Sequence, residues 1–170
     1  MELSHRFVLT AAPATVPLAA RVRDALYDAA GRAAMQDLRW PTVFARLEAM
    51  RDEGRRSIRI VDAACGTASL LLHTIRTARM LGFVAIEARG VECDGALLAE
   101  ARRVAATIQD PAIDLTFHIG TAEAAMRDEI AFPADILLYT AAIEQIGVQM
   151  ALARRAGRLA LAGPRSGAGA

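Results

Sequence analysis

A regular alternation of strand-like and helix-like segments from Ile58 to Ala162 is the feature that most restricts the fold of this chain. Short runs rich in Ile, Val and Leu are separated by longer segments whose apolar residues recur with helical spacing. The strand-like runs are 58–62, 85–92, 113–119, 134–140 and 158–162; the helical segments are 67–81, 95–108, 121–129 and 142–155. Asp94 is expected to cap the helix that starts at 95. Such alternation requires parallel strands joined by right-handed crossovers. We therefore expect an α/β fold with a doubly wound, mostly parallel sheet of about five strands.

The N-terminal part differs in pattern. It predicts one helix over 17–35 and a second that opens at Pro41 and ends at the Asp52-Glu53-Gly54 turn. We interpret residues 1–55 as an N-terminal helical lid or arm, 56–165 as the ligand-binding domain and 166–170 as a disordered tail.

The charged residues exclude several classes of function. All 20 basic residues are Arg, and the chain contains no Lys and no Asn. A P-loop lysine, a pyridoxal-phosphate Schiff base and an N-glycosylation site are therefore excluded. The net charge of +1 comes from Arg residues scattered among acids, which disfavours a nucleic-acid partner. Abundant Arg and Ala are typical of a GC-rich bacterial genome. No apolar run is long enough to span a membrane, and we expect a cytoplasmic protein.

The carboxyl ends of the predicted strands are where a doubly wound sheet binds its ligand. Small residues follow Asp62 at the end of the first strand, so a ligand could approach the backbone and the free amides of the next helix. Glu92 ends the second strand, where a carboxylate can accept both hydroxyls of a ribose. The third strand ends in the turn 120–123, which could lie along the edge of an adenine ring.

These segments resemble the motifs of the class I S-adenosylmethionine-dependent methyltransferases. The first motif of that family reads roughly Asp-x-Gly-Cys-Gly-Thr-Gly, and residues 62–68 read Asp-Ala-Ala-Cys-Gly-Thr-Ala. Its second motif corresponds to Gly90-Val91-Glu92 and its third to residues 120–123, Gly-Thr-Ala-Glu. The resemblance covers about 58–164 in the right order, and it implies a Rossmann-like fold for a short member of the family.

The resemblance also implies S-adenosylmethionine as cofactor, with S-adenosylhomocysteine as product. The residues that match cofactor-binding positions are Asp62, Ala63, Ala64, Cys65, Gly66, Glu92, Cys93, Thr121, Ala122 and Thr140. Those after the first strand would hold the methionine part. Glu92 would bind the ribose and Cys93 would pack against the adenine. Thr121 and Ala122 would flank the adenine edge, and Thr140 would lie near the sulfonium and the substrate.

Tyr139 and Glu144 follow the fourth strand, where the transferred methyl group would point in this family. Either could orient or deprotonate a nucleophile. The fourth strand lacks the Asn-Pro-Pro-Tyr sequence of enzymes that methylate amino groups on bases or glutamine. We therefore predict a methyltransferase that acts on an N, O or C nucleophile of a small molecule, without a metal.

Some features depart from the family pattern and keep other interpretations open. Ala64 and Ala68 replace glycines, Thr121 replaces an Asp, and the chain ends near the end of the fifth strand, where the family commonly continues. A catalytically inactive scaffold or partner subunit is the alternative function. A homodimer or a partner chain is expected to cover the edge of the fifth strand. A nicotinamide-dinucleotide site would keep only one glycine of three.

The cysteines and histidines have simpler interpretations than chemistry. Cys65 and Cys93 end neighbouring strands, so a redox pair or a metal site is an alternative, but we expect both to be buried as small hydrophobic residues. His118 alternates with apolar residues on a strand and is expected in the core or at a layer interface. His73 is expected at the surface.

Overall fold

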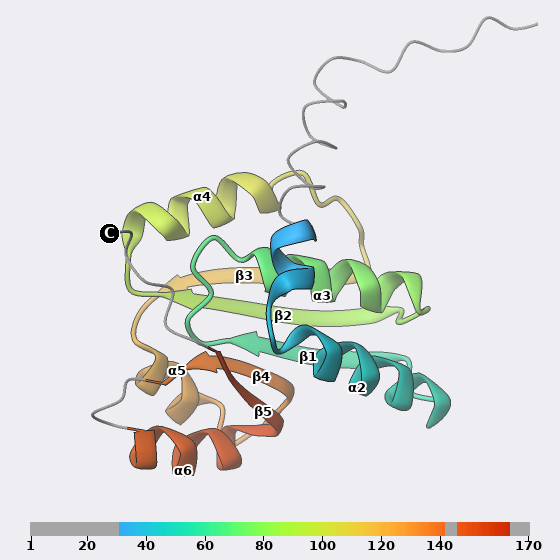
Figure 1. Cartoon of the computed structure of the whole chain (residues 1–170). Coiled ribbons are helices and arrows are strands. Elements are labelled where there is room, and N and C mark those ends of the chain that lie inside the picture. Colours follow the sequence, from blue (N-terminus) through green and yellow to red (C-terminus); the bar gives the residue numbers. More distant parts are fainter. Residues whose placement is uncertain (1–30, 142–145, 164–170) are drawn as a thin grey trace, which may run out of the picture.

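The computed structural model describes residues 31–141 and 146–163, and it confirms the predicted α/β class (Figure 1). Five strands form one sheet in the order β3-β2-β1-β4-β5, and all neighbouring strands are parallel. The elements are α2 (Trp40–Asp52), β1 (Ser57–Asp62), α3 (Ser69–Met80), β2 (Ala85–Glu92), α4 (Gly95–Ala105), β3 (Ile113–Ile119), α5 (Ala122–Asp128), β4 (Ala134–Thr140), α6 (Ile146–Ala156) and β5 (Gly157–Gly163).

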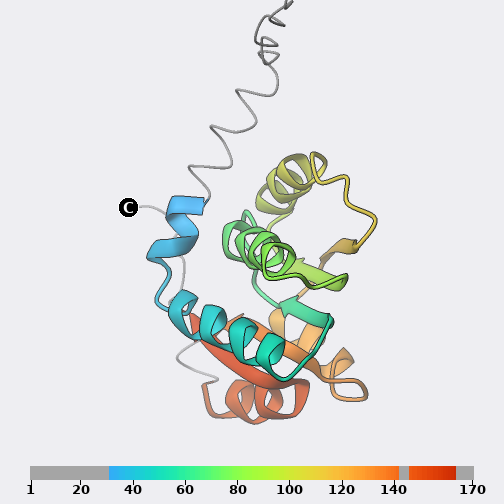
Figure 2. The ribbon, with the colours of Figure 1, turned by 90° about the vertical axis from the view of Figure 1, so that its right-hand side faces the viewer.

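Helices cover the two faces of the sheet (Figures 1 and 2). Helices α2, α3 and α4 lie on one face, where Ile60 and Leu138 point into the larger hydrophobic core. Helices α5 and α6 lie on the other face, where Val61 and Leu137 belong to a second core. Because side chains alternate along a strand, neighbouring residues of β1 and β4 supply both cores. This explains why these central strands are continuously apolar.

The predicted helix boundaries are close to those observed, with two informative differences. Helix α3 begins at Ser69 rather than Thr67, because Ala68 before it has a left-handed φ of 63°. Helix α4 ends at Ala105, earlier than the predicted Ile108. Its predicted cap is confirmed: the Asp94 carboxylate accepts hydrogen bonds from two amides of the first turn. The predicted start of the sixth helix, at 142, lies outside the described residues.

Helix α2 is built into the fold. Its side chains Val43, Leu47 and Met50 are fully buried in the same core as β1 and α3. The indole of Trp40 also packs edge-on against the imidazole of His73 on α3, with ring centroids 4.3 Å apart. His73 is therefore half-buried and not the surface residue expected. Most of the predicted helix at 17–35 lies outside the described residues. The described part of this segment is helical, and that helix runs to residue 36. The boundaries at 55 and 166 stay predictions.

The surfaces of the sheet differ in polarity. On β3, the side chains of Asp114, Thr116 and His118 are exposed on the face that α5 and α6 leave uncovered. The prediction that His118 is a core residue is wrong, because β3 is an edge strand with only one covered face.

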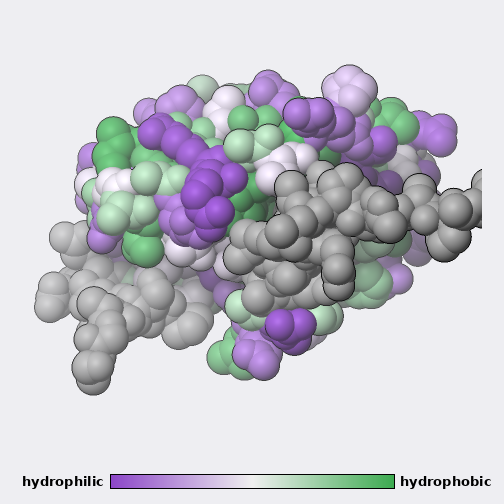
Figure 3. Space-filling view, turned by 90° about the horizontal axis from the view of Figure 1, so that it is seen from above, coloured by the Kyte–Doolittle hydropathy of each residue, from purple (hydrophilic) through white to green (hydrophobic). Residues whose placement is uncertain are grey.

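Seen from the side of α3 and α4, hydrophilic and hydrophobic residues are interspersed on the molecular surface (Figure 3). None of the described helices is long and apolar enough to cross a bilayer.

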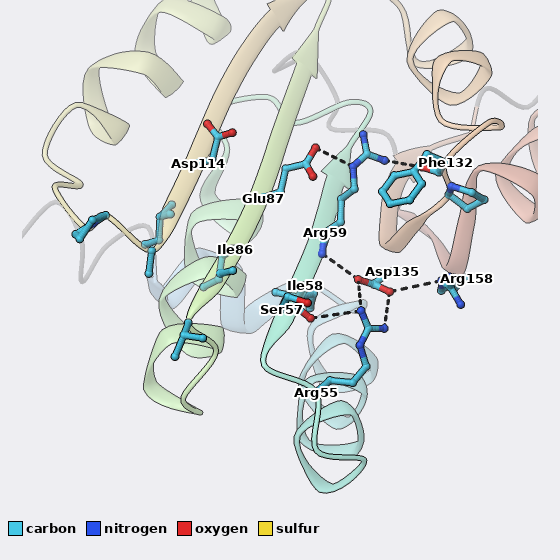
Figure 4. A pocket seen from close by; sticks show the side chains of 16 residues that line it. Arg55, Ser57, Ile58, Arg59, Ile86, Glu87, Asp114, Phe132, Asp135 and Arg158 are labelled. Carbon is cyan, nitrogen blue, oxygen red and sulfur yellow. Dashed lines mark hydrogen bonds and ion pairs between the residues drawn. The ribbon is translucent and has the colours of Figure 1, made fainter.

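A pocket of about 510 Å³ lies at the amino ends of the strands (Figure 4). Most of its charged side chains form ion pairs. The Arg55 guanidinium donates to both oxygens of Asp135, at 2.7 and 3.0 Å, and Arg59 donates to Glu87 at 2.8 Å. Arg59 also pairs with the buried carboxylate of Glu129. Most of the charges of this pocket thus hold neighbouring segments together, at the edge opposite the predicted ligand site.

Removal of the Arg59 guanidinium should destabilise the fold markedly. Arg59→Ala leaves the carboxylate of Glu129, which is 1% exposed, with Arg89 as its remaining cationic partner. Loss of one partner from a buried ion pair typically costs about 3–5 kcal/mol. We expect a loss near the lower value, because Arg89 still pairs with the Glu129 carboxylate. Arg103→Ala, which breaks an exposed pair with Glu100, is the control and should change the free energy of unfolding far less. Urea unfolding of the two variants measures the difference.

Candidate functional site

Backbone hydrogen bonds bring the predicted ligand-binding segments together at the carboxyl edge of the sheet. The Ala63 amide donates to the Leu138 carbonyl of β4 at 2.8 Å, and the Cys65 amide donates to the Val91 carbonyl of β2 at 2.9 Å. The Gly120 amide, after β3, donates to the Glu92 carbonyl at 3.0 Å. Each contact is made where a strand ends. The loop after β1 therefore lies between the ends of β2 and β4.

Glu92 ties this loop to β2. One carboxylate oxygen accepts from the Gly66 amide at 2.8 Å; the other accepts from the amides of Cys93 and Asp94 at 2.8 and 3.0 Å. Burial raises the pKa of Glu92, but the hydrogen bonds from these amides and the Cys93 thiol outweigh it and lower the pKa. The side chain is therefore a carboxylate held in a fixed position and able to accept further hydrogen bonds.

The loop between β1 and α3 has room for a ligand at Gly66. The φ of Gly66 is +55°, and a Cβ added there would meet no protein atom within 4 Å. Ala64 is not among the described residues with positive φ, so the alanine is accommodated without strain, whereas Ala68 has a φ of 63°. The thiol of Cys65 is buried, and it lies 3.1 Å from the position of a Cβ on Gly90.

The other predicted cofactor-binding residues border the same edge. Cys93 is exposed, so the expectation of a buried cysteine is wrong for this residue. Its sulfur lies 3.3 Å from a Glu92 oxygen. Thr121 is the N-cap of α5, and its hydroxyl accepts from the Ala124 amide at 3.2 Å. Ala122 and Thr140 are half-buried. Among the residues in the described ranges, no group of three His, Cys, Asp or Glu could hold a metal ion.

The two catalytic candidates are less favourably placed. Tyr139 is 4% exposed and its ring belongs to the second hydrophobic core. Packing accounts for this side chain, and a catalytic role of its hydroxyl stays a prediction. Glu144 lies outside the described residues.

Asp62 is a buried carboxylate at the end of β1, only 2% exposed. Burial raises its pKa to about 6, against the lowering effects of the nearby Arg39 charge and of the Ala64 amide, which donates to it at 3.3 Å. A buried carboxylate with an unusual pKa at a strand end is typical of a functional site. The arrangement suits a cationic group of a ligand, which would favour the ionised form.

The sequence did not indicate Arg39. This residue precedes α2, and its guanidinium reaches the Tyr139 carbonyl at the end of β4 at 3.3 Å. Two of its nitrogens donate to Asp37 at 2.7 and 2.9 Å. The contact joins residues 100 positions apart, and no local pattern announces it.

Replacement of Asp62 should stabilise the protein at neutral pH. Because the pKa of Asp62 is higher in the folded state, about 6, than the ordinary 3.8, the folded state binds the proton more tightly and stability falls as pH rises from about 4 to 6. Asp62→Asn keeps an oxygen for the Ala64 amide and removes this cost, about 1–3 kcal/mol at pH 7. Urea unfolding at pH 4 and 7 measures it. Asp114→Asn, at an exposed site, controls for the lost charge; equal effects of both variants would contradict the interpretation.

The structure is similar to solved methyltransferases. It matches a Listeria monocytogenes protein, provisionally described as a class I S-adenosylmethionine-dependent methyltransferase, with a TM-score of 0.50 and 22% identity over 71% of this chain and 38% of that one. CalS10 of Micromonospora echinaspora, an amino pentose methyltransferase involved in calicheamicin biosynthesis, has a TM-score of 0.41 and 17% identity over 88% of this chain and 52% of that one. No family model and no curated protein matches the sequence. This chain covers less than two thirds of the length of either of these two proteins. The match to the Listeria monocytogenes protein shows that this chain has the Rossmann-like fold of the class I S-adenosylmethionine-dependent methyltransferases.

Proposed function

We propose that this protein is an S-adenosylmethionine-dependent methyltransferase that acts on an N, O or C nucleophile of a small molecule. The observation that carries the proposal is the hydrogen bond between the Gly66 amide and the Glu92 carboxylate, 2.8 Å long. It joins a loop with open space above it to an acid at the end of the next strand. In a doubly wound sheet this is the position at which a nucleoside binds with its ribose on the acid.

The residues present fit such a cofactor. Asp62, buried and short of hydrogen-bond donors, would bind the ammonium of the methionine part, and the backbone from Ala63 to Gly66 would follow that chain. Glu92 would accept a ribose hydroxyl on the oxygen that bonds the Gly66 amide, which has a lone pair left. Exposed Cys93 would lie against the adenine. Thr121 and Ala122 would border the adenine edge.

The chemistry requires little from the protein. The cofactor supplies a methyl group already activated by a positively charged sulfur. The chain would bind it, orient the nucleophile in line with the methyl group and exclude water. Thr140, at the end of β4, would lie near the entering substrate. We retain Tyr139 and Glu144 as the candidates for orienting or deprotonating the nucleophile, a contribution that an activated methyl group makes optional.

An inactive scaffold or partner subunit is the second candidate, and one observation favours it. Ala68 has a left-handed φ of 63°, a conformation that costs a non-glycine residue about 1–2 kcal/mol. The family typically has a glycine at this position, which adopts this φ without strain. A strained alanine here is expected if cofactor binding is no longer under selection. Cofactor binding without methyl transfer to any substrate would support this second function.

We also propose that a second copy of the chain covers β5. Within the described residues β5 pairs with β4 alone. Antiparallel pairing of two β5 strands about Ala160 would place Leu159 opposite Leu161 and Arg158 opposite Ala162, so that apolar residues meet and no like charges face each other. Helix α6 beside it exposes further apolar side chains, which are Ile146, Val148 and Met150.

Calorimetric titration with S-adenosylhomocysteine tests the cofactor site. Gly66→Ala and Gly54→Ala both place a Cβ at positive φ, +55° and +79°, with nothing within 4 Å. Each should lose about 1–2 kcal/mol of stability. Only Gly66→Ala should weaken binding, by tenfold or more, because its Cβ occupies the space above the loop. Glu92→Gln should weaken binding as well. Absence of binding by the unchanged protein at millimolar ligand would refute the proposal.

Sedimentation equilibrium tests the dimer. The unchanged protein should be dimeric at micromolar concentration, and Val148→Glu should shift it toward monomer because a carboxylate is costly to bury in an apolar interface. Met80→Glu is the control: Met80 is also exposed, at 78%, but lies at the end of α3, away from β5. A monomeric unchanged protein, or equal effects of both variants, would contradict this assembly.

A further inference from the structure

Arg39 lies beside Asp62 although the two residues belong to different layers. The Arg39 guanidinium donates to the carbonyl of Tyr139. The residue before Tyr139, Leu138, is the register partner of Asp62, and its carbonyl accepts from the amide of Ala63. The guanidinium therefore contacts the residue that follows the β4 partner of Asp62.

The position of the guanidinium is fixed by three segments of the chain. Its Nε and Nη2 donate to the two oxygens of Asp37, and only 12% of the side chain is exposed. On β5, a Cβ added to Gly163 would come within 2.6 Å of the Arg39 Cζ, so the guanidinium fills the space that a side chain there would take. The segment before α2, β4 and β5 together hold this charge in place.

The charged groups around Asp62 leave a net negative charge for a ligand. Arg39 and Asp37 face it from the segment before α2, Glu92 faces it from β2, and Cys65 faces it from the loop after β1. The Cys65 thiol is kept neutral, because burial and the nearby carboxylates raise its pKa. Arg39 and Asp37 offset one another, so the three groups Asp37, Arg39 and Asp62 carry one negative charge together. Among the described residues, Arg39 is the only cation that acts on Asp62.

We infer that Arg39 is a positioning residue of the cofactor site: its guanidinium keeps Asp62 in the ionised form that receives the ammonium group of the ligand. This inference rests on the proposed function. It gives the segment before α2 a part in ligand binding without direct contact with the ligand. It also explains why Arg39 is buried at the ligand edge of the sheet, where Asp37 neutralises its charge.

The pH dependence of S-adenosylhomocysteine binding tests the inference. Binding by the unchanged protein should weaken on acidification through about pH 6, where Asp62 takes up a proton. Arg39→Gln removes the charge but keeps donors for Asp37 and Tyr139, and it should move this midpoint up by about one pH unit, since an opposite charge lowers a carboxyl pKa by roughly 1–3 units. Affinity should therefore fall about twofold at pH 7 and roughly fivefold at pH 6 and recover at pH 8.5, whereas Arg39→Lys should restore the midpoint.

A merely structural role would weaken binding equally at every pH, and an unmoved midpoint would overturn the inference. Gly163→Ala is the second variant, since its Cβ displaces the guanidinium without a change of charge and should move the midpoint in the same direction. Arg46→Gln, on the outer part of α2, controls for loss of one positive charge and should leave the midpoint unmoved.

A ligand-free measurement separates the two failures. The ¹³C resonance of the Asp62 carboxyl reports its protonation directly, and its midpoint should rise in Arg39→Gln whether or not the protein binds the cofactor. If that midpoint rises while S-adenosylhomocysteine does not bind, the proposed function fails and the control of Asp62 by Arg39 stands. If the ligand binds and the resonance midpoint does not move, the inference fails and the proposed function stands.

Discussion

The carboxylate of Glu92 is the contact on which the ligand edge of this molecule depends. It accepts hydrogen bonds from three backbone amides, one from the loop after β1 and two from its own turn after β2. Hydrogen bonds to a charged acceptor contribute more than neutral ones, of order 1.5–3 kcal/mol each. The loop after β1 has few other constraints on its ligand side, as the open space at Gly66 shows. Without this carboxylate, the loop would lose its hydrogen bond from Gly66 to β2, and the Cys65 amide, which donates to the Val91 carbonyl, would still hold it there.

Asp62 has the opposite relation to stability. It sits at the end of the central strand, where both faces of the sheet are covered, and burial makes its ionised form costly. The fold offsets part of this cost with Arg39, whose own burial is compensated by Asp37. An ionisable group that the fold must stabilise at such expense is best explained by a ligand that needs it. If Asp62 binds a ligand as proposed, the segment before α2 would take part in that binding through Arg39.

The sequence predicted those features that depend on local pattern. Alternating apolar runs identify the five strands, and the cap residue Asp94 identifies the start of α4, because strand burial and helix capping both depend on neighbours in sequence. Features that depend on distant partners were not predictable. The exposure of His118 follows from the edge position of β3, and the place of Arg39 follows from a contact with Tyr139. The positive φ of Ala68 delays α3 by two residues, and no propensity rule anticipates an alanine in that conformation.

The contrast between the two acids decides how much a mutation can reveal about function. At Glu92 stability and ligand binding coincide, because the same oxygens hold the loop and would face the ribose; a loss of binding after its replacement has two explanations. At Asp62 stability and ligand binding are opposed, because the negative charge that a ligand would bind also destabilises the folded protein at neutral pH. A protein that merely retained the fold would lose nothing by exchanging Asp62 for a neutral residue. The presence of the buried carboxylate at this position is thus stronger physical support for a cationic ligand than the better-connected Glu92 is for a ribose.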